Sequence, residues 1–424
     1  MPKLTVITAN IDSPEWLELF IKSVLKFSVT NPDIIVIDNG SLEDNLRWIK
    51  YQKNIRLHES KVNLGHGGAM DLGTRMAEAK YVCFLDVDSH VMREGWDKEL
   101  IQIYENSPEI KLIGCIGPEH KPLHPPLFFY ERDFIINNNL SFNYIPNHPK
   151  STDTAQKIYW DILDLGYKVM RLEKGKKEYG CIGDEIHFGS KSLIYHHWYG
   201  TRFCENNPEK KKEKLDGYTL EEHLKNKERL FEQPKVKEIL EYNTDIIFRD
   251  YEKCRREMRS LNGLPWIEPG AIELLDKVVN KESTILEVGA GSSTVWFARK
   301  AKYVLSFEHN ELWFRIAGDE LEKYNLENFA ILYRPDYPKK GLPEEEINDI
   351  YDVVFIDGPT EGRNSPIETG IKHIKPGGYL VLDDAQRTEL YAEGLALLEK
   401  QGWENWDFNV PGYVRHTRVW KASK

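Results

Sequence analysis

The sequence predicts an α/β protein built from two doubly wound domains that a helical connector joins. Strand-like and helix-like patterns alternate through roughly the first two hundred residues, a charge-dense and glycine-poor stretch follows, and a second alternation then begins. Such alternation is typical of parallel sheets covered by helices on both faces. We therefore expect a first domain over residues 1–205, a connector over 206–262 and a second domain over 263–424.

The first domain begins with a short apolar strand, LTVITA, followed by the helical pattern SPEWLELFIKSVLKF. Ser13 suits the N-cap of this helix, and Pro14 suits its first position, where the missing N–H breaks no hydrogen bond. The strands DIIVIDNGS and IRLHES precede the helical GAMDLGTRMAEAK, and the strand YVCFLDVD follows it. Because ligands of such sheets bind at the carboxyl ends of the strands, we expect a binding site there.

The connector and the second domain differ in composition. Residues 206–262 carry many charges and few glycines, which predicts a solvated helical segment. NGLPWIEPG then interrupts the chain, and strand-like runs follow, most of them separated by helical stretches. These runs are TILEVGA, YVLSFEH, FAILYRP, YDVVFIDG and GYLVLDD.

Composition disfavours several classes of protein. The chain of 424 residues is 41% hydrophobic, which is enough for sizeable cores, and its net charge of −11 argues against nucleic acid as a partner. No apolar run is long enough to span a bilayer, and the N-terminus has no signal-peptide pattern, so we expect a cytoplasmic protein without a transmembrane segment. Five scattered cysteines without a CxxC pair suggest reduced thiols.

Two carboxylates follow the apolar strand at residues 81–85. Side chains two apart on a strand point to the same side, so Asp86 and Asp88 present their carboxylates together. Hard divalent cations prefer oxygen ligands and pair with phosphates, so this D-x-D can hold a metal that neutralises a diphosphate. A D-x-D alone is more often a turn or a helix cap. Here another strand also ends in an acid, Asp38, and the glycine-rich NLGHGGAMDLG lets a ligand approach the backbone closely.

This run of strands and turns resembles glycosyltransferase family 2, which has the GT-A fold. The resemblance covers residues 3–100 well and continues more loosely to about 205. It implies inverting transfer of a sugar from a nucleotide-diphosphate donor, with a Mn²⁺ or Mg²⁺ ion. Asp88, with Asp86, would bind this ion, and Asp86 would also contact the nucleotide ribose. The nucleotide-sugar-binding residues that the resemblance implies are Thr8, Asp38, Asn39, Asn63, Gly65 and Asp86.

Two later segments fit the same site. A histidine at the place of IYHHWYGTRF often completes the metal shell in GT-A enzymes, so His196 and His197 are candidates, although at least one of them is expected to have another role. Asp153 stands at a predicted helix start, where it can simply cap the helix. Alternatively, Asp153 is the catalytic base that takes the proton from the acceptor hydroxyl. Asp71 departs from the family, which often has asparagine there.

A glycine-rich turn follows the first strand of the second domain. LEVGAGSST contains G-x-G, but Thr294 stands where a dinucleotide-binding fingerprint requires its third glycine, which disfavours a dehydrogenase. Glu287 stands two residues before the first glycine. Seventeen residues after Gly291 comes Glu308, at the end of the next strand, where an acid can accept hydrogen bonds from both ribose hydroxyls of an adenosine.

This half resembles the class I S-adenosylmethionine-dependent methyltransferases over about residues 264–424. The cofactor-binding residues that the resemblance implies are Glu287, Gly289, Gly291, Ser292, Ser293, Glu308 and Asp357. Asp357, Asp383 and Asp384 are also similar to the metal triad of catechol-type O-methyltransferases, whose last position is usually asparagine, so metal use stays open. The candidates for the catalytic base are Asp357, Asp384, His373 and His416.

Together the two halves predict a bifunctional enzyme of polysaccharide biosynthesis. It would add a sugar to an oligosaccharide or glycolipid acceptor, with peripheral membrane contact in the second case, and methylate a glycan hydroxyl. Its cofactors would be S-adenosylmethionine and Mn²⁺ or Mg²⁺. The alternative is a methyltransferase whose degenerate first half only binds a glycan. A nucleotidyltransferase is disfavoured because TANIDSPEW is neither glycine-rich nor basic.

Overall fold

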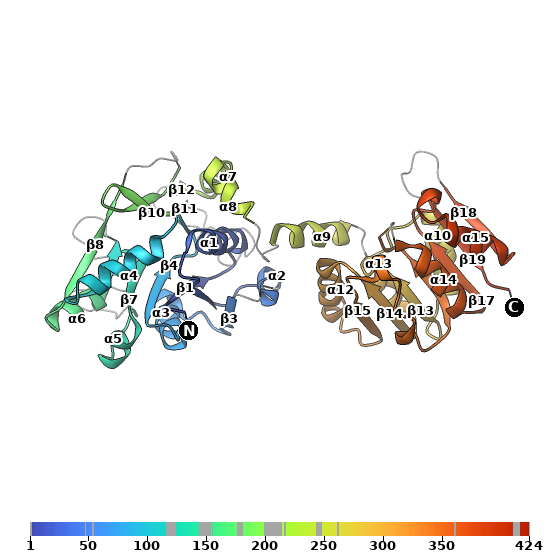
Figure 1. Ribbon diagram of the computed structural model, residues 1–424, viewed down its shortest axis with the longest axis horizontal. Helices are drawn as coiled ribbons and strands as arrows, with labels where there is room; N and C mark the ends of the chain where they lie inside the picture. The colour runs from blue at the N-terminus through green and yellow to red at the C-terminus, as the bar shows by residue number, and fades with distance from the viewer. Residues whose placement is uncertain are drawn as a thin grey trace. The chain divides into compact units, whose positions relative to one another are not determined.

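The computed structural model divides the chain into two compact units, Met1–Phe248 and Arg249–Lys424. Each contains one large sheet with helices around it (Figure 1). No helix among the described residues is long and apolar enough to cross a membrane. The structure describes residues 2–46, 48–52, 55–115, 124–143, 154, 156–175, 181–198, 214–215, 218–242, 248–260, 263–359, 362–409 and 416–423.

The N-terminal unit is built on a ten-stranded mixed sheet. Its first four strands in space, β3-β2-β1-β4, are parallel, as predicted. Beyond β4 the pairs are antiparallel except β6 with β8. In spatial order the strands are β3 (Ile55–Glu59), β2 (Asp33–Asp38), β1 (Leu4–Asn10), β4 (Tyr81–Leu85), β7 (His124–Glu131), β6 (Ile110–Cys115), β8 (Lys168–Lys174), β9 (Asp184–Phe188), β10 (Lys191–His196) and β5 (Ser89–Val91).

Helices pack on this sheet through apolar faces. Every residue of β4 is buried, which explains its continuous apolar run, and α3 packs on β1 and β2. α1 begins at Pro14 as predicted, but the Ser13 hydroxyl donates to the carbonyl oxygen of Ile11 at 2.8 Å instead of capping the helix. The helices are α1 (Pro14–Phe27), α2 (Glu43–Leu46), α3 (Gly65–Met76), α4 (Trp96–Asn106), α5 (Arg132–Asn137) and α6 (Gln156–Asp164), with a 3₁₀ turn at Ile49–Tyr51.

The segment for which we expected a connector is divided between the two units, and its first part, up to Phe248, belongs to the N-terminal unit. α7 (Leu220–Phe231) and α8 (Pro234–Leu240) follow a short ladder of β11 (Lys214–Leu215) and β12 (Tyr218–Thr219). α8 packs on α1, where Nζ of Lys22 donates to the carbonyl oxygen of Leu240 at 2.7 Å. The apolar faces of these charge-rich helices are therefore buried in the first unit rather than solvated.

The C-terminal unit is built on a seven-stranded sheet. All of the strand-like runs in the second half form strands, and they pair in parallel in the order β15-β14-β13-β16-β17. β19 and β18 extend the sheet with antiparallel pairing. The strands are β13 (Thr284–Val288), β14 (Tyr303–Glu308), β15 (Phe329–Tyr333), β16 (Tyr351–Ile356), β17 (Ile374–Leu382), β18 (Glu404–Phe408) and β19 (Thr417–Lys421).

Helices between the parallel strands make this unit doubly wound. α11 and α12 pack on β14, and α14 packs on β16 and β17. The predicted α/β class with two such sheets is therefore confirmed. The helices are α9 (Phe248–Ser260), α10 (Pro269–Val278), α11 (Ser292–Lys300), α12 (Glu311–Lys323), α13 (Tyr337–Lys340), α14 (Asn364–His373) and α15 (Ala392–Lys400), and 3₁₀ turns lie at Glu344–Glu346 and Thr388–Leu390.

Candidate functional site

The D-x-D sequence lies at the carboxyl end of β4, where the chain turns into β5. The backbone N–H of Ser89 donates to the carbonyl oxygen of Asp86 at 2.9 Å, which closes the turn that carries both carboxylates. β5 then pairs with β10 in an antiparallel register that places Ser89 opposite His196. This pairing brings a histidine from far along the sequence to Asp86 and Asp88.

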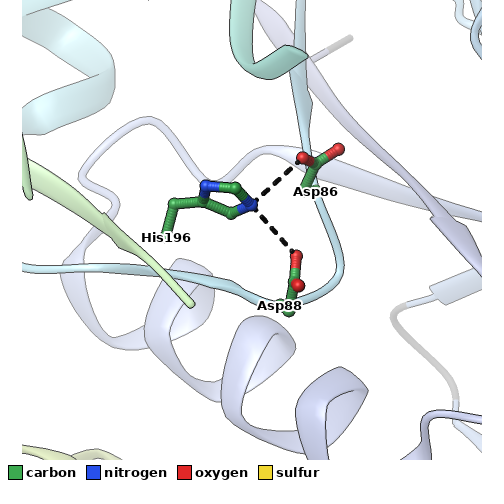
Figure 2. A group of neighbouring side chains, drawn as sticks. All are labelled: Asp86, Asp88 and His196. Atoms are coloured by element: carbon green, nitrogen blue, oxygen red, sulfur yellow. Dashed lines mark ion pairs between the residues drawn. The ribbon is translucent and has the colours of Figure 1, made fainter. Parts of the chain in front are cut away.

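Asp86, Asp88 and His196 form a compact group (Figure 2). Nε2 of His196 is 3.5 Å from Oδ2 of Asp86 and 3.5 Å from Oδ1 of Asp88, and one possible ligand atom of each residue lies within 4.8 Å of the others. Burial alone would lower the pKa of His196, but the carboxylates, Asp88 first, outweigh it and raise that pKa above its ordinary value. Two carboxylates and an imidazole that converge in this way fit a Mn²⁺ or Mg²⁺ ion.

His66 also contacts this group, although the sequence analysis did not select it. It stands in the first turn of α3, and its Nε2 lies 2.8 Å from Oδ1 of Asp86. The carboxylate of Asp86 therefore has a histidine at each oxygen, which fixes its orientation. The only signal in the sequence was a histidine inside the glycine-rich GHGG run at the start of a helix.

The adjacent histidines of the HH pair lie in different environments. The ring of His197 packs against Trp16 of α1, with ring centroids 4.3 Å apart, and its Nε2 is 2.8 Å from Nδ2 of Asn226 on α7. Burial, followed by the neighbouring His223, lowers the pKa of His197 well below its ordinary value. His197 is therefore a neutral packing residue between α1 and α7, and only His196 of the pair lies at the D-x-D.

Asp38 ends β2 and is fully buried. Its carboxylate accepts hydrogen bonds from the backbone N–H groups of Gly40 and Ser41, at 3.0 and 2.9 Å. The side chains of Asn10 and Ser41 also donate to it. Asp38 thus holds the turn after β2, which the family resemblance places beside the nucleoside.

The other predicted nucleotide-sugar residues lie near β1, β2 and the start of α3. Asn39 bridges the turn after β2 to α3, because its Nδ2 donates to the carbonyl oxygen of Gly65 at 3.5 Å. Oδ1 of Asn63 accepts the N–H of Gly65 at 2.8 Å. Thr8 is fully buried within β1, and its hydroxyl has no hydrogen-bond partner among the described residues. Asn39 and Asn63 thus shape the backbone around Gly65.

Asp71, the departure from the family pattern, fastens α3 to the segment at residues 141–143. Its carboxylate accepts the N–H of Phe142 at 2.8 Å and an amide hydrogen of Asn143 at 2.9 Å. The two backbones pass so closely that a Cβ at Gly67 would lie 2.4 Å from the carbonyl oxygen of Phe142. These hydrogen bonds to residues 142 and 143 account for an aspartate at position 71.

Asp153, the predicted base, lies outside the described residues. A buried carboxylate that the sequence analysis missed, Asp184, stands opposite His196 in the antiparallel pair of β9 and β10. Its Oδ2 accepts hydrogen bonds from Nζ of Lys174 at 2.5 Å and from Nε1 of Trp198 at 3.1 Å. The strand register, and not the sequence pattern, reveals that Asp184 is a neighbour of the Asp86–Asp88–His196 group.

In the C-terminal unit the glycine-rich turn after β13 is shaped by close approach. Gly289 has a φ of +101°, and a Cβ there would lie 2.6 Å from the carbonyl oxygen of Asp357. Thr294, in place of the third glycine, accepts the N–H of Gly291 at 2.9 Å and donates its hydroxyl to Glu287 at 2.6 Å. Thr294 therefore stabilises the turn where a dinucleotide fingerprint would have glycine.

Glu287 supports this turn from inside the unit. It is fully buried and accepts hydrogen bonds from the hydroxyls of Ser293, at 2.6 Å, Thr294 and Ser306. Burial raises the pKa of Glu287 to about 7, although these hydrogen bonds act in the opposite direction. Ser292, the first residue of α11, is also buried. These hydrogen bonds thus hold the carboxylate of Glu287 against the residues that follow the glycine-rich turn.

We expect the C-terminal unit to lose stability as the pH rises from about 4.5 to about 7. A carboxyl group whose pKa is raised by folding favours the folded state at low pH, and this contribution disappears as the pH passes through the folded pKa. For Glu287, with a pKa of about 7 against 4.5, the loss is on the order of 3 kcal/mol. Urea unfolding of the wild type and of Glu287→Gln between pH 4.5 and 8 measures it. Identical pH slopes for the two proteins would contradict this expectation.

Glu308 ends β14 and reaches the same glycine-rich turn. Its Oε2 accepts the N–H of Ala290 at 2.7 Å, and its Oε1 accepts the N–H of Asn310 at 2.6 Å. Nδ1 of His309 lies 2.9 Å from Oε1. Glu308 is therefore held beside the turn at the carboxyl ends of adjacent parallel strands.

The aspartates at the ends of β16 and β17 do not converge on one point. Asp383 is fully buried, and its Oδ1 accepts a hydrogen bond from the hydroxyl of Thr417 at 2.8 Å. Asp384 has a φ of +54°, and its Oδ2 lies 3.3 Å from Nη2 of Arg387. Asp357 is half-buried after β16. Within the described part of the chain, only the group at Asp86 has the spacing for a metal ion. The sequence similarity of Asp357, Asp383 and Asp384 to a metal triad is therefore not matched by a metal-like spacing of their side chains.

Two of the candidate bases are histidines, one at the amino end of a strand and one in contact with a carboxylate. His373 ends α14 directly before β17 begins, and its Nδ1 is 2.9 Å from the carbonyl oxygen of Asp349. It therefore stands at the amino end of β17, whereas Asp357 follows the carboxyl end of β16. Nε2 of His416 contacts a carboxylate oxygen of Asp407 of β18.

Sequence comparison finds a family model that matches part of the N-terminal unit. Residues 5–147 match the model of glycosyl transferase family 2. An uncharacterized glycosyltransferase of Haemophilus influenzae is 25% identical over 117 residues, 27% of this chain and 36% of that protein. TarS of Staphylococcus aureus, a poly(ribitol-phosphate) beta-N-acetylglucosaminyltransferase, is 24% identical over 134 residues, 30% of this chain and 23% of that protein. The matches thus span only part of the length of these relatives.

Solved structures are similar to parts of the chain. The crystal structure of Staphylococcus aureus TarS with UDP-GlcNAc is 18% identical, covers 42% of this chain and 60% of its own, and has a TM-score of 0.32. A SAM-dependent O-methyltransferase from Thermotoga maritima is 19% identical, covers 40% of this chain and 71% of its own, and has a TM-score of 0.31. Residues 5–147 are thus similar to glycosyl transferase family 2.

Proposed function

We propose that the chain is a bifunctional glycan-modifying enzyme, in which the N-terminal unit transfers a sugar from a nucleotide-diphosphate donor and the C-terminal unit methylates a glycan hydroxyl. The observation that carries the first activity is the Asp86–Asp88–His196 group at the carboxyl end of β4, whose two aspartates lie inside the stretch that matches glycosyl transferase family 2. Ligands of open α/β sheets bind at such strand ends.

In the N-terminal unit, Asp86, Asp88 and His196 would hold a Mn²⁺ or Mg²⁺ ion. Such an ion would neutralise charge on the diphosphate leaving group. The chain's own contribution is orientation, because His66 and His196 hold the two oxygens of Asp86. Inversion requires a base that takes the acceptor proton on the opposite face of the sugar. Asp153 is the predicted base, and Asp184 is a second candidate because of its place beside His196.

In the C-terminal unit, the turn from Gly289 to Ser293, Glu308 and Asp357 would surround S-adenosylmethionine. The support is that the glycine turn, Glu308 and Asp357 follow three neighbouring parallel strands, β13, β14 and β16. The bound cofactor would supply an activated methyl group. The chain's residues would align the acceptor hydroxyl for in-line attack, with Asp357 or Asp384 as the candidate base.

The acceptor is proposed to be an oligosaccharide or glycolipid. One relative is named for transfer to poly(ribitol phosphate), so a cell-surface polymer is one candidate class. The rival proposal, a methyltransferase whose first half only binds a glycan, is disfavoured by the complete Asp86–Asp88–His196 group, because glycan binding alone does not require it.

Thermal unfolding with a panel of ligands tests both activities. The panel consists of UDP, GDP, TDP and CMP with and without Mn²⁺, S-adenosylhomocysteine, and NAD as a control. A ligand at a hundred times its dissociation constant adds about 2.7 kcal/mol to the unit that binds it. We expect a Mn²⁺-dependent shift with one nucleotide and a separate shift with S-adenosylhomocysteine. A shift with S-adenosylhomocysteine alone would favour the rival proposal, and no shift with it would contradict the methyltransferase.

A further inference from the structure

The hydroxyl group of Tyr337 has no hydrogen-bond partner in the described part of the protein. Tyr337 is the first residue of α13, which follows β15, and it is only 2% exposed. Its hydroxyl oxygen is buried and unpaired among the described residues. Because buried polar groups are nearly always hydrogen-bonded, this hydroxyl suits a partner that the described residues do not provide.

The hydroxyl lies at the carboxyl ends of the parallel strands. A Cβ atom at Gly358, just after β16, would lie 2.2 Å from the Tyr337 hydroxyl oxygen and 3.3 Å from Cγ1 of Val288, the last residue of β13. Glu308 and Asp357 are the acids whose charges act on the hydroxyl. The hydroxyl therefore lies near the end of β13, and the strands on either side of β13 carry Glu308 and Asp357 at their carboxyl ends.

The chemistry of this position favours a ligand with hydroxyl groups. Burial, and then the charge of Glu308, raise the pKa of Tyr337, so the phenol keeps its proton and can donate it. Glu308 accepts one backbone N–H at each oxygen, and Nδ1 of His309 also lies 2.9 Å from Oε1. Because a carboxylate has about four acceptor sites, Oε2 can accept one more hydrogen bond. A ligand hydroxyl group between the two residues can therefore donate to Glu308 and accept from Tyr337.

We propose that Tyr337 is a nucleoside-binding residue, whose hydroxyl group hydrogen-bonds to a ribose hydroxyl of S-adenosylmethionine beside Glu308. This rests on the methyltransferase activity proposed above and adds to it a residue from α13. The absence of a partner among the residues that the structure describes distinguishes Tyr337 from Glu287, whose carboxylate accepts hydrogen bonds from three hydroxyl groups.

The test compares Tyr337→Phe with the wild type in the full chain. The phenyl ring keeps the packing against His309, whose ring centroid is 5.7 Å away. We expect the unliganded variant to unfold at the same or a higher temperature, because the hydroxyl has no hydrogen-bond partner among the described residues. By calorimetry it should bind S-adenosylhomocysteine about three- to tenfold more weakly, the usual effect of one neutral hydrogen bond. Tyr351→Phe, at the start of β16 on the opposite edge of the sheet, is the matched control and should bind normally.

Analogues of S-adenosylhomocysteine without the 2′- or the 3′-hydroxyl complete the experiment. The effect of Tyr337→Phe should vanish for the analogue that lacks the paired hydroxyl and persist for the other one. Equal binding of S-adenosylhomocysteine by variant and wild type, or an equal loss with both analogues, would overturn the assignment. A lower unfolding temperature of the free variant would also overturn it, because the hydroxyl would then have a structural partner. A wild type that does not bind S-adenosylhomocysteine at all would instead refute the proposed methyltransferase, and this assignment with it.

Discussion

Replacing Asp88 with asparagine is expected to reduce sugar transfer by at least about a hundredfold and to abolish Mn²⁺-dependent binding of the nucleotide. Preorganised charge at a leaving group contributes on this scale to catalysis. The change removes one of the two carboxylates that converge with His196, while the volume of the side chain stays the same. Transfer from the nucleotide sugar identified by the ligand panel, and calorimetry of the nucleotide with and without Mn²⁺, measure the two effects.

The matched control for this prediction is Glu94→Gln, an exposed acid shortly after the D-x-D turn. It changes the net charge equally and should leave transfer and nucleotide binding unchanged. Asp88→Asn should also unfold at a temperature close to that of the wild type, because the loss of the attraction between Asp88 and His196 is offset by the loss of the repulsion between Asp88 and Asp86. Full transfer by a folded Asp88→Asn variant would refute the assignment of this group to the donor diphosphate.

Replacing Gly289 with alanine is expected to destabilise the C-terminal unit by about 2–5 kcal/mol, through a strained backbone and overpacking. Its φ of +101° disfavours any side chain, and the new Cβ would lie 2.6 Å from the carbonyl oxygen of Asp357 and 2.8 Å from the N atom of Gly358. Both of these contacts are backbone atoms, which have little freedom to move. Urea unfolding of the variant, with tryptophan fluorescence as the signal, measures the loss.

Gly291 in the same turn separates the effect on folding from the effect on binding. Its φ of 179° is extended, and a Cβ there would contact only the ring of Trp313, at 4.0 Å. Gly291→Ala should therefore change stability by no more than about 0.5 kcal/mol. It should still weaken S-adenosylhomocysteine binding, because the added methyl group occupies space that the turn leaves open. Equal stability losses at both glycines, or normal binding by Gly291→Ala, would contradict this account.

The sequence by itself determined where the strands and their acidic ends lie. Period-two and helical patterns are local, so they predicted the parallel strands of both units and the pairing of Asp86 with Asp88. They also placed Glu308 at the end of β14, one strand away from the glycine-rich turn. The antiparallel strands from β7 to β10 were not recognised, because their spacing does not follow the strand–helix alternation.

Tertiary structure decided which side chains meet. The pairing of β5 with β10 selects His196 over His197, and the position of α14 removes His373 from the carboxyl edge. His196 and His197 are adjacent, so the residues around them in the sequence are nearly the same. The pairing of strands that are distant in the sequence gives them different neighbours in space. The physical reason is that adjacent residues set side-chain periodicity, whereas long-range packing decides which side chains meet. Long-range packing formed the Asp86–Asp88–His196 group, buried the acid Glu287, and left the hydroxyl of Tyr337 without a partner among the described residues.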